Sequence, residues 1–414
     1  MLGISKPTHN RVFSKGGDRQ GGSMVEPVIC AVSRTPVGRF RGALRNYTAA
    51  ELGSLAVVEL LQRAGISASS GMVDEVLFGQ VLQAGAGQAP ARQVALGAGL
   101  PNSTPCTTIN KVCGSSLKAV MIAASAIRAG EYEVVIAGGM ESMTNSPHFA
   151  QKTGKNEYSE MKSVLMHDGL WDGYIDQHMG NTGEKVARDF DITREDSDNY
   201  SVRSHRLAHQ SWESGLFEWE AFPVQGVDRD GNPMMLVHDQ GIRASTSVTE
   251  LGELKPVFDD AGQVTAGNAS QISDGASAVL VVSSDRAEAE GWEILASIVD
   301  QTTSGLAPAD VMTAPIPAVR MLLERNNLTI DDIDVVEHNE AFASASCAVA
   351  KELEIPDEKF NIHGGAIAIG HPLGSTGTRC LMTLINALRT TGGSKGIVTI
   401  CLGGGNAVAV LISI

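Results

Sequence analysis

The sequence predicts an α/β protein made of two similar halves, with a long insertion in the first half. Apolar runs of strand length alternate with helical patterns, which favours a layered α/β unit with a largely parallel sheet. The order of helix, glycine, strand and glycine over residues 116–139 recurs over residues 376–405, which indicates duplication of one architecture. Residues 145–265 interrupt this pattern with many charges and several turn signals.

Composition narrows the class of protein. The 414 residues are 43% hydrophobic and 19% charged, as expected of a globular chain of two or three units. The net charge of −15 argues against a nucleic-acid partner, and no apolar run has the length of a membrane span. The six cysteines form no C-x-x-C pair, so we expect no structural metal site. With no signal peptide apparent, they favour a reducing compartment, the cytoplasm.

Residues 1–23 differ from the rest of the chain. They are rich in Gly, Ser, Lys and Arg and carry no periodic apolar pattern. We expect a disordered leader, with Met24 as the natural start. The alternative is a presequence for the mitochondrial matrix, because Arg11, Lys15 and Arg19 outnumber the single acid Asp18. The Gly-Gly pairs and the missing apolar face favour the first interpretation.

The elements of the first half follow from local signals. After a short apolar strand over residues 28–32, Thr48 and Glu51 form a capping box that predicts a helix start. Gly65 predicts the end of that helix. A strand over residues 73–81, a helix over residues 87–98 and a strand over residues 106–110 are expected next.

The stretch N-K-V-C-G-S-S, residues 110–116, places Cys113 between a strand and a helix of small and apolar residues that ends near Gly130. A buried strand over residues 133–139 follows. We expect Cys113 in the first turn of the helix, where the helix dipole and unpaired N–H groups would lower its pKa. The alternative is a small core residue, since most free cysteines are buried.

The insertion and the second half also carry sequence patterns that predict helices and strands. Helical patterns cover residues 181–189 and 193–213, and residues 276–283 return to buried-strand composition. In the second half, a helix over residues 376–389 precedes a strand over residues 396–401.

Four glycine-flanked stretches could meet at one site. They are the Cys113 turn, N-E-A-F-A from Asn339, G-G-A-I-A-I-G-H-P-L-G-S-T-G with His371, and C-L-G-G-G from Cys401. Each stands where a strand ends, which is where open α/β sheets bind ligands. Singly, His371 could be a loop histidine, Asn339 a helix cap and Cys401 a core residue.

Together these residues suit acyl-transfer chemistry. A cysteine with a nearby histidine supplies a nucleophile and its activating base. A second cysteine supplies a general acid or base for a weakly acidic C–H or a departing thiolate. Glycine-rich backbone supplies N–H groups for an oxyanion.

From residue 24 to residue 414 the sequence resembles the thiolase family, most closely its acetyl-CoA acetyltransferase branch. The resemblance rests on N-K-V-C-G-S, N-E-A-F-A, G-G-A-I-A-I-G-H-P-L-G-x-T-G, C-x-G-G-G, and T-A-G-N-A-S ending at Ser270. It implies duplicated α/β halves in five layers, α-β-α-β-α, with each half a mixed sheet. It also implies an N-terminal half of residues 24–144 and 273–293, an insertion domain of residues 145–272, and a C-terminal half of residues 294–414.

The resemblance also implies the role of each site residue. Cys113 would attack the thioester, His371 would take the thiol proton, and Cys401 would move a proton at the α-carbon or on CoA. Asn339 would hold a water in one oxyanion hole, and the N–H groups of Cys113 and Gly403 would form the other. The thioester already acidifies the α-carbon, so no cofactor is implied beyond coenzyme A as substrate and product.

For coenzyme A itself, the resemblance places Arg243 near the nucleotide and Ser270 along the pantetheine arm. His178 and Met179 would line the acyl pocket. Arg243 as a surface charge and Met179 as plain packing are the alternatives. The implied partners are acetyl-CoA, acetoacetyl-CoA and CoA, together with a second copy in a homodimer or homotetramer.

Three positions depart from the commonest family pattern: Ser116, His338 and Ala407. None removes a catalytic residue, but they leave substrate range and pH optimum open. We expect reversible Claisen condensation of two acetyl-CoA to acetoacetyl-CoA and CoA. One rival is a longer-chain 3-ketoacyl-CoA thiolase of β-oxidation. Another is a non-catalytic acyl-CoA or sterol carrier on the same scaffold.

Overall fold

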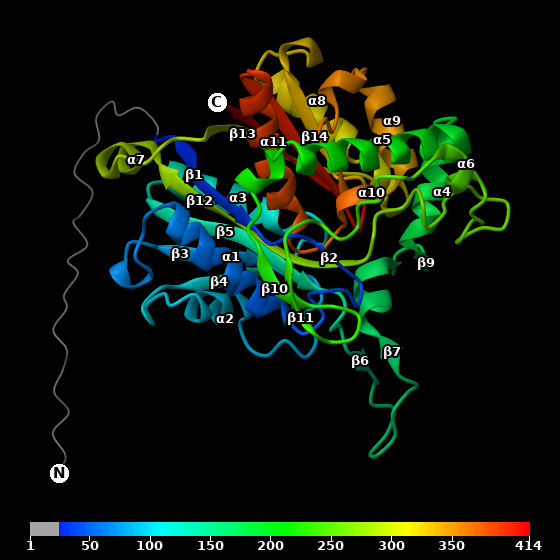
Figure 1. The fold of residues 1–414 in the computed structure, drawn as a ribbon, viewed down its shortest axis with the longest axis horizontal. Helices are drawn as coiled ribbons and strands as arrows, with labels where there is room; N and C mark the ends of the chain where they lie inside the picture. The colour runs from blue at the N-terminus through cyan, green and yellow to red at the C-terminus, as the bar shows by residue number, and fades with distance from the viewer. Residues whose placement is uncertain (1–24) are drawn as a thin grey trace.

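The computed structural model describes residues 25–414, so the expected leader at residues 1–23 lies outside the described part (Figure 1). Most strands join one large mixed sheet. Its strands are β1 (Pro27–Arg34), β2 (Gly38–Arg39), β3 (Glu75–Gly79), β4 (Cys106–Ile109), β5 (Val134–Ser142), β12 (Ser273–Ser283), β13 (Ala296–Gly305), β14 (Val335–His338), β15 (Lys395–Leu402) and β16 (Asn406–Ser413).

Helices pack on this sheet and fill the stretch between β5 and β12. They are α1 (Ala49–Arg63), α2 (Pro90–Gly97), α3 (Ser115–Arg128), α4 (Met179–Asp189), α5 (Arg194–Glu213), α6 (Val248–Gly252), α7 (Ser284–Glu290), α8 (Pro315–Arg325), α9 (Ala343–Glu352), α10 (Ala366–Ile369) and α11 (Thr376–Thr391). Three small hairpins also lie between β5 and β12: β6 (His148–Phe149) with β7 (Lys162–Ser163), β8 (Trp171–Asp172) with β9 (Gln177–His178), and β10 (Val224–Val227) with β11 (Pro233–Leu236). Among residues 25–414, no helix combines the length and apolar composition needed to cross a membrane.

Strand order confirms the duplication. The sheet runs β14-β15-β16-β13-β1-β12-β5-β3-β4, with β1 and β13 joining the halves. In the first half β3 and β5 pair in parallel, and β12 pairs antiparallel with both β5 and β1. In the second half β14, β15, β16 and β13 repeat this pattern. The counterpart of β4 is reduced to one parallel bridge between Val336 and Phe360.

The expectation of a largely parallel sheet is wrong. Parallel pairing is confined to β3 with its two neighbours and to β14 with β15. The turn between β15 and β16 shows the physical reason. Only residues 403–405 separate Leu402 from its cross-strand partner Asn406, and so short a connection forces the two strands to be antiparallel.

Three clusters of buried side chains define the five layers. One joins α3 and α11 to the facing sides of both half-sheets, so these two helices form the central layer. A second packs α1 and α2 on the outer face of the first half-sheet, and a third packs α8 and α9 on that of the second. Figure 1 shows this succession from α2 and α1, through α3 and α11, to α8 and α9. The predicted α-β-α-β-α order is therefore confirmed.

Local signals explain where the helices begin. Thr48 caps α1 and Glu51 returns the hydrogen bond, as the capping box predicted. In α5 the same reciprocal pair is formed by Thr193 and Asp196. These bonds satisfy N–H groups that the first helical turn leaves unpaired.

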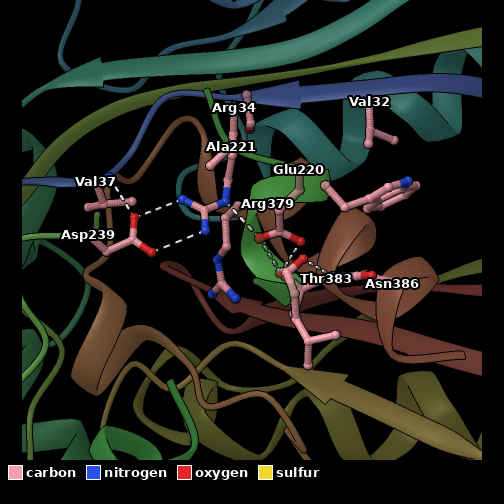
Figure 2. Close-up of polar contacts among 12 residues, drawn as sticks. Val32, Arg34, Val37, Glu220, Ala221, Asp239, Arg379, Thr383 and Asn386 are labelled. Atoms are coloured by element: carbon pink, nitrogen blue, oxygen red, sulfur yellow. Dashed lines mark hydrogen bonds and ion pairs between the residues drawn. The ribbon is translucent and has the colours of Figure 1, made fainter. Parts of the chain in front are cut away.

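A buried ion-pair network ties the stretch between β5 and β12 to both halves (Figure 2). Arg34 of β1 donates from Nε to Glu220 Oε1 at 2.7 Å, and from Nη1 and Nη2 to the two oxygens of Asp239 at 2.7 and 3.1 Å. Thr383 of α11 donates to Glu220 at 3.2 Å. Because Glu220 and Asp239 both come from that stretch, one guanidinium fixes it to β1, and Glu220 extends the link to α11.

Replacement of Arg34 by Met should destabilise the protein strongly. Glu220 and Asp239 would be left buried without their cation, and breaking a buried pair in this way costs about 3–5 kcal/mol. The free energy of unfolding in urea measures the loss.

Arg320→Met is the matched control. Arg320 is 58% exposed and lies 3.6 Å from Glu352, so its loss should cost no more than about 1 kcal/mol. Equal losses in the two variants would contradict the role given to the Arg34 network.

Candidate active site

The ends of the central strands and helices surround a small cavity of about 60 Å³. Cys113, His371, Cys401 and Gly403 all line it, so the structure brings together residues from both halves. The remaining lining residues are Val112, Gly169, Leu170, Met179, Ser270, Val311, Met312, Ala341, Phe342, Leu373 and Leu402.

Cys113 lies in a strained turn between β4 and α3. The preceding residue, Val112, has φ of 47°, a rare conformation for a β-branched residue. Asn110 Oδ1 accepts the N–H of Val112 at 3.0 Å and holds this turn. The first residue of α3 is Ser115, so the expectation that Cys113 occupies the first helical turn is wrong. The turn instead directs the half-buried sulfur into the cavity.

The expected lowering of the Cys113 pKa is also wrong. Burial raises the pKa of the thiol to about 12, although N–H groups of Cys113 itself and of Gly403 point to the sulfur and act in the opposite direction. Desolvation outweighs these dipoles because the sulfur faces apolar walls. At neutral pH the resting group is therefore the thiol, and it needs a base. Two N–H groups that converge on one point are an arrangement that can stabilise an oxyanion.

His371 is held in one orientation by its loop. Gly370 has φ of 112°, and a Cβ there would lie 2.4 Å from Ser273 Oγ, so the turn before His371 requires glycine. Thr376 donates its hydroxyl to Pro372 O at 3.0 Å and lies 2.7 Å from His371 Nδ1. Thr376 must then accept the proton of Nδ1. The Nε2 atom is left unprotonated and available as a base.

The charge state of His371 agrees with this assignment. Burial, and to a smaller degree the positive charge of buried Arg379, lower the pKa of His371 to about 3. The imidazole is therefore neutral at physiological pH. A neutral imidazole beside a neutral thiol indicates that the proton moves during attack, rather than in a pre-formed ion pair.

Asn339 follows β14 and is fully buried. Its Nδ2 lies 3.4 Å from His371 Nε2, so the structure brings the two residues together. Its Oδ1 has no hydrogen-bond partner among the described residues. An unpaired amide oxygen beside the unprotonated ring nitrogen is a suitable place for one water.

Cys401 stands near the end of β15, only 2% exposed, and lines the same cavity. Burial, and then the nearby Cys113, raise its pKa above the ordinary range. A thiol with a raised pKa gives a strongly basic thiolate once its proton has left. Such a base suits a weakly acidic C–H group.

Of the four residues predicted to bind coenzyme A, the structure places two at the cavity and two outside it. Met179 and Ser270 line the cavity. His178 does not: it stacks on Phe258 with ring centroids 4.5 Å apart and caps α4 by accepting the N–H of Gly180. Arg243 is exposed and outside the cavity, and its N–H donates to His205 Nδ1 at 3.1 Å.

Several contributors to the site were missed in the sequence. Glu141 is fully buried and accepts N–H groups of Val81, Leu82 and Gly374, so it clamps the His371 loop to the first half. Burial raises its pKa to about 7. Glu141 lies two residues after the strand motif of residues 133–139, but nothing local marks it as a clamp.

Thr376 was visible within the glycine-rich motif, five residues after His371. By contrast, Val311 and Met312 reach the cavity from a 3₁₀ turn, Pro308–Thr313, that carries no recognisable signal.

Each of the three residues that depart from the commonest family pattern has a defined neighbour in the structure. Ser116 Oγ accepts the N–H of Thr378 at 3.0 Å, joining α3 to α11. His338 is buried against Phe360, and burial lowers its pKa to about 3, so it adds no charge at neutral pH. Ala407 is the cross-strand partner of Cys401.

These features fit an acyl-transferring enzyme with a duplicated α/β fold. Family models for the thiolase N-terminal domain and the thiolase C-terminal domain match residues 27–285 and 292–414. The chain belongs to the thiolase family.

Relatives and a solved structure agree. An acetyl-CoA acetyltransferase of Pseudomonas aeruginosa is 43% identical over 94% of this chain and 100% of its own length. A probable acetyl-CoA acetyltransferase of Escherichia coli is 44% identical over 94% and 99%. A probable acetyl-CoA acyltransferase of Staphylococcus epidermidis is 40% identical over 93% and 98%. The crystal structure of the Bacillus anthracis acetyl-CoA acetyltransferase superposes with a TM-score of 0.90 at 37% identity, covering 94% of this chain and 99% of that one.

The protonated resting state of Cys113 predicts the pH dependence of its alkylation. Since its pKa of about 12 lies above the ordinary cysteine value, the thiolate fraction should be small at neutral pH and grow with each rise in pH. The rate of Cys113 modification by iodoacetamide, followed by peptide mass, should rise from about pH 7 to about pH 9 without a plateau. Saturation at or below neutral pH would reveal a stable thiolate–imidazolium pair and contradict this account.

Proposed function

We propose that this protein catalyses the reversible Claisen condensation of two acetyl-CoA to acetoacetyl-CoA and CoA, through an acyl group on Cys113. The observation that carries the proposal is the meeting of Cys113, His371 and Cys401 around one small cavity. A nucleophile, its base and a second acid–base group are the parts that two-step acyl transfer requires.

In the first step Cys113 Sγ attacks the carbonyl carbon of acetyl-CoA while His371 Nε2 takes the thiol proton. The N–H groups of Cys113 and Gly403 stabilise the oxyanion. The C–S bond to CoA then breaks, and Cys401 protonates the departing thiolate. The products are acetyl-Cys113, free CoA, protonated His371 and the Cys401 thiolate.

In the second step the Cys401 thiolate removes an α-proton from a second acetyl-CoA. His371 and a water on Asn339 hold the oxygen of the resulting enolate. The α-carbon of this enolate attacks the carbonyl carbon of acetyl-Cys113. When the bond to Cys113 breaks, His371 returns its proton to the Cys113 sulfur, and the three groups regain their starting states. The thioester supplies the acidity of the α-carbon, so the proposal uses coenzyme A as substrate and product, with no further cofactor.

The cavity favours a short acyl chain. A water-sized group needs about 10–15 Å³, so a cavity of about 60 Å³ has room for about four to six non-hydrogen atoms. The acetoacetyl group has six. A longer-chain 3-ketoacyl-CoA thiolase is the second candidate, and the Staphylococcus epidermidis relative named as a probable acetyl-CoA acyltransferase favours it. A sterol or acyl-CoA carrier would not need two cysteines and a neutral histidine around one cavity.

The finer parts of the proposal concern coenzyme A and assembly. Met179 contacts the acyl end of the substrate, Ser270 contacts the pantetheine arm, and exposed Arg243 serves the nucleotide. His178, which stacks on Phe258, lies outside the acyl cavity. The protein acts in the cytoplasm as a homodimer or homotetramer.

Thiolysis across acyl-chain lengths tests the proposal. CoA-dependent cleavage of 3-ketoacyl-CoA substrates from four to sixteen carbons should be fastest at four carbons and fall steeply beyond, because the cavity that Leu170, Val311 and Met312 help to line holds only about 60 Å³. Activity should be lost in Cys113→Ser. Rates that rise with chain length would favour the second candidate instead. Binding of acetoacetyl-CoA without turnover would favour the carrier.

A further inference from the structure

Glu340 is the charged residue of the N-E-A-F-A motif, and the proposed reaction does not use it. Its side chain is fully buried and accepts four hydrogen bonds. Oε1 accepts from the Tyr200 hydroxyl at 3.0 Å and from Asn361 Nδ2 at 3.1 Å. Oε2 accepts from Ser204 Oγ at 2.7 Å and from the N–H of Ile367 at 3.1 Å. We call these five residues the Glu340 cluster.

The Glu340 carboxylate has only neutral partners. Within residues 25–414 it forms no ion pair. A carboxylate accepts at about four lone-pair sites and donates at none, so the four bonds use its whole capacity. Burial of a charge is costly unless such bonds replace its water. A glutamine would avoid that cost, but its amide would present a donor where two of the four donors now point.

The Glu340 cluster joins the stretch between β5 and β12 to the segment that leads to His371. Tyr200 and Ser204 come from α5, while Ile367 lies in α10, four residues before His371. Ser204 Oγ also accepts the N–H of Gly365 at 3.1 Å. A Cβ on Gly365 would lie 2.3 Å from the carboxyl carbon of Glu340, so the approach of α10 requires glycine there.

The position of Asn339 depends on its neighbours in the chain. In the described part of the protein, its amide contacts only His371 Nε2, at 3.4 Å, and its Oδ1 has no partner. On one side, the N–H of His338 donates to Asn361 Oδ1 at 2.7 Å, and Asn361 Nδ2 donates to His338 O at 2.9 Å. On the other side stands Glu340. Both anchors of Asn339 therefore belong to, or are held by, the Glu340 cluster.

We infer that Glu340 is a positioning residue that aligns Asn339 with His371 for the second step of the proposed reaction. The inference rests on the proposed function, in which a water on Asn339 helps to hold the enolate oxygen. Attack by Cys113 uses a different oxyanion site, the N–H groups of Cys113 and Gly403. Misalignment of Asn339 should therefore slow carbon–carbon bond formation and spare acyl transfer to Cys113.

Two assays on the full-length protein separate these steps. Exchange of labelled CoA into acetyl-CoA requires only transfer of the acetyl group to Cys113 and back, whereas formation of acetoacetyl-CoA also requires the enolate. In Glu340→Gln the ratio of condensation rate to exchange rate should fall at least about tenfold, because a small misplacement of a transition-state group is costly. Partial unfolding would lower both rates in proportion and leave the ratio unchanged.

Ser204→Ala is a milder second variant, because it removes one donor and keeps the carboxylate. Its ratio should fall in the same direction by about threefold, the effect of one hydrogen bond. Glu184→Gln is the matched control. Glu184 is another buried carboxylate, on α4, and accepts the N–H groups of Gln263 and Val264. Its ratio should equal that of the wild type.

The outcomes distinguish the inference from the proposed function. An unchanged ratio in Glu340→Gln and Ser204→Ala, or an equal fall in Glu184→Gln, would overturn the inference and leave the proposed function intact. If Glu340→Gln does not fold, Ser204→Ala decides alone. A wild-type protein that neither exchanges CoA nor condenses acetyl-CoA would refute the proposed function and the inference together.

Discussion

The site depends on how closely the His371 loop approaches the first half of the molecule. A Cβ on Gly139 would lie 1.9 Å from the carbonyl oxygen of Gly374, and one on Gly377 would lie 2.4 Å from the N–H nitrogen of Leu117. These glycines are required for space and not for their backbone angles. Any side chain at this contact would push the loop of His371 away from the turn of Cys113.

The duplication of the α/β half explains why the contact between the His371 loop and the first half assembles the site. Cys113 lies just before α3 and His371 just before α11, and these are equivalent central helices of the two halves. When α3 and α11 pack side by side, the two loops that precede them meet. Cys401 and Asn339 then arrive from β15 and the end of β14, while Glu141 secures the His371 loop from β5. The site thus requires both copies of one architecture, each contributing different chemistry.

Much of this arrangement could be predicted from the sequence, and the exceptions have physical reasons. The capping boxes at Thr48 and Thr193, the strand that ends near Cys401 and the convergence of Cys113 with His371 follow local patterns or family motifs. Three expectations were wrong, because the direction of strand pairing, the start of α3 after the Cys113 turn and the pKa of Cys113 all depend on the surroundings in space. Strand direction is set by connections such as residues 403–405, and the pKa of Cys113 is set by apolar walls that outweigh the nearby N–H dipoles. The Arg34 network joins segments about two hundred positions apart, which no local pattern reveals.

The central claim is that Cys113 carries the acyl group while Cys401 only moves protons. The most direct test is to mix the protein with acetoacetyl-CoA, quench in acid and map the modified peptides by mass. The account predicts one acetyl group, on the peptide containing Cys113, and the same labelled peptide in a Cys401→Ala variant that turns over poorly. Acetyl on the Cys401 peptide, or unmodified cysteines in a protein that still turns over, would contradict it.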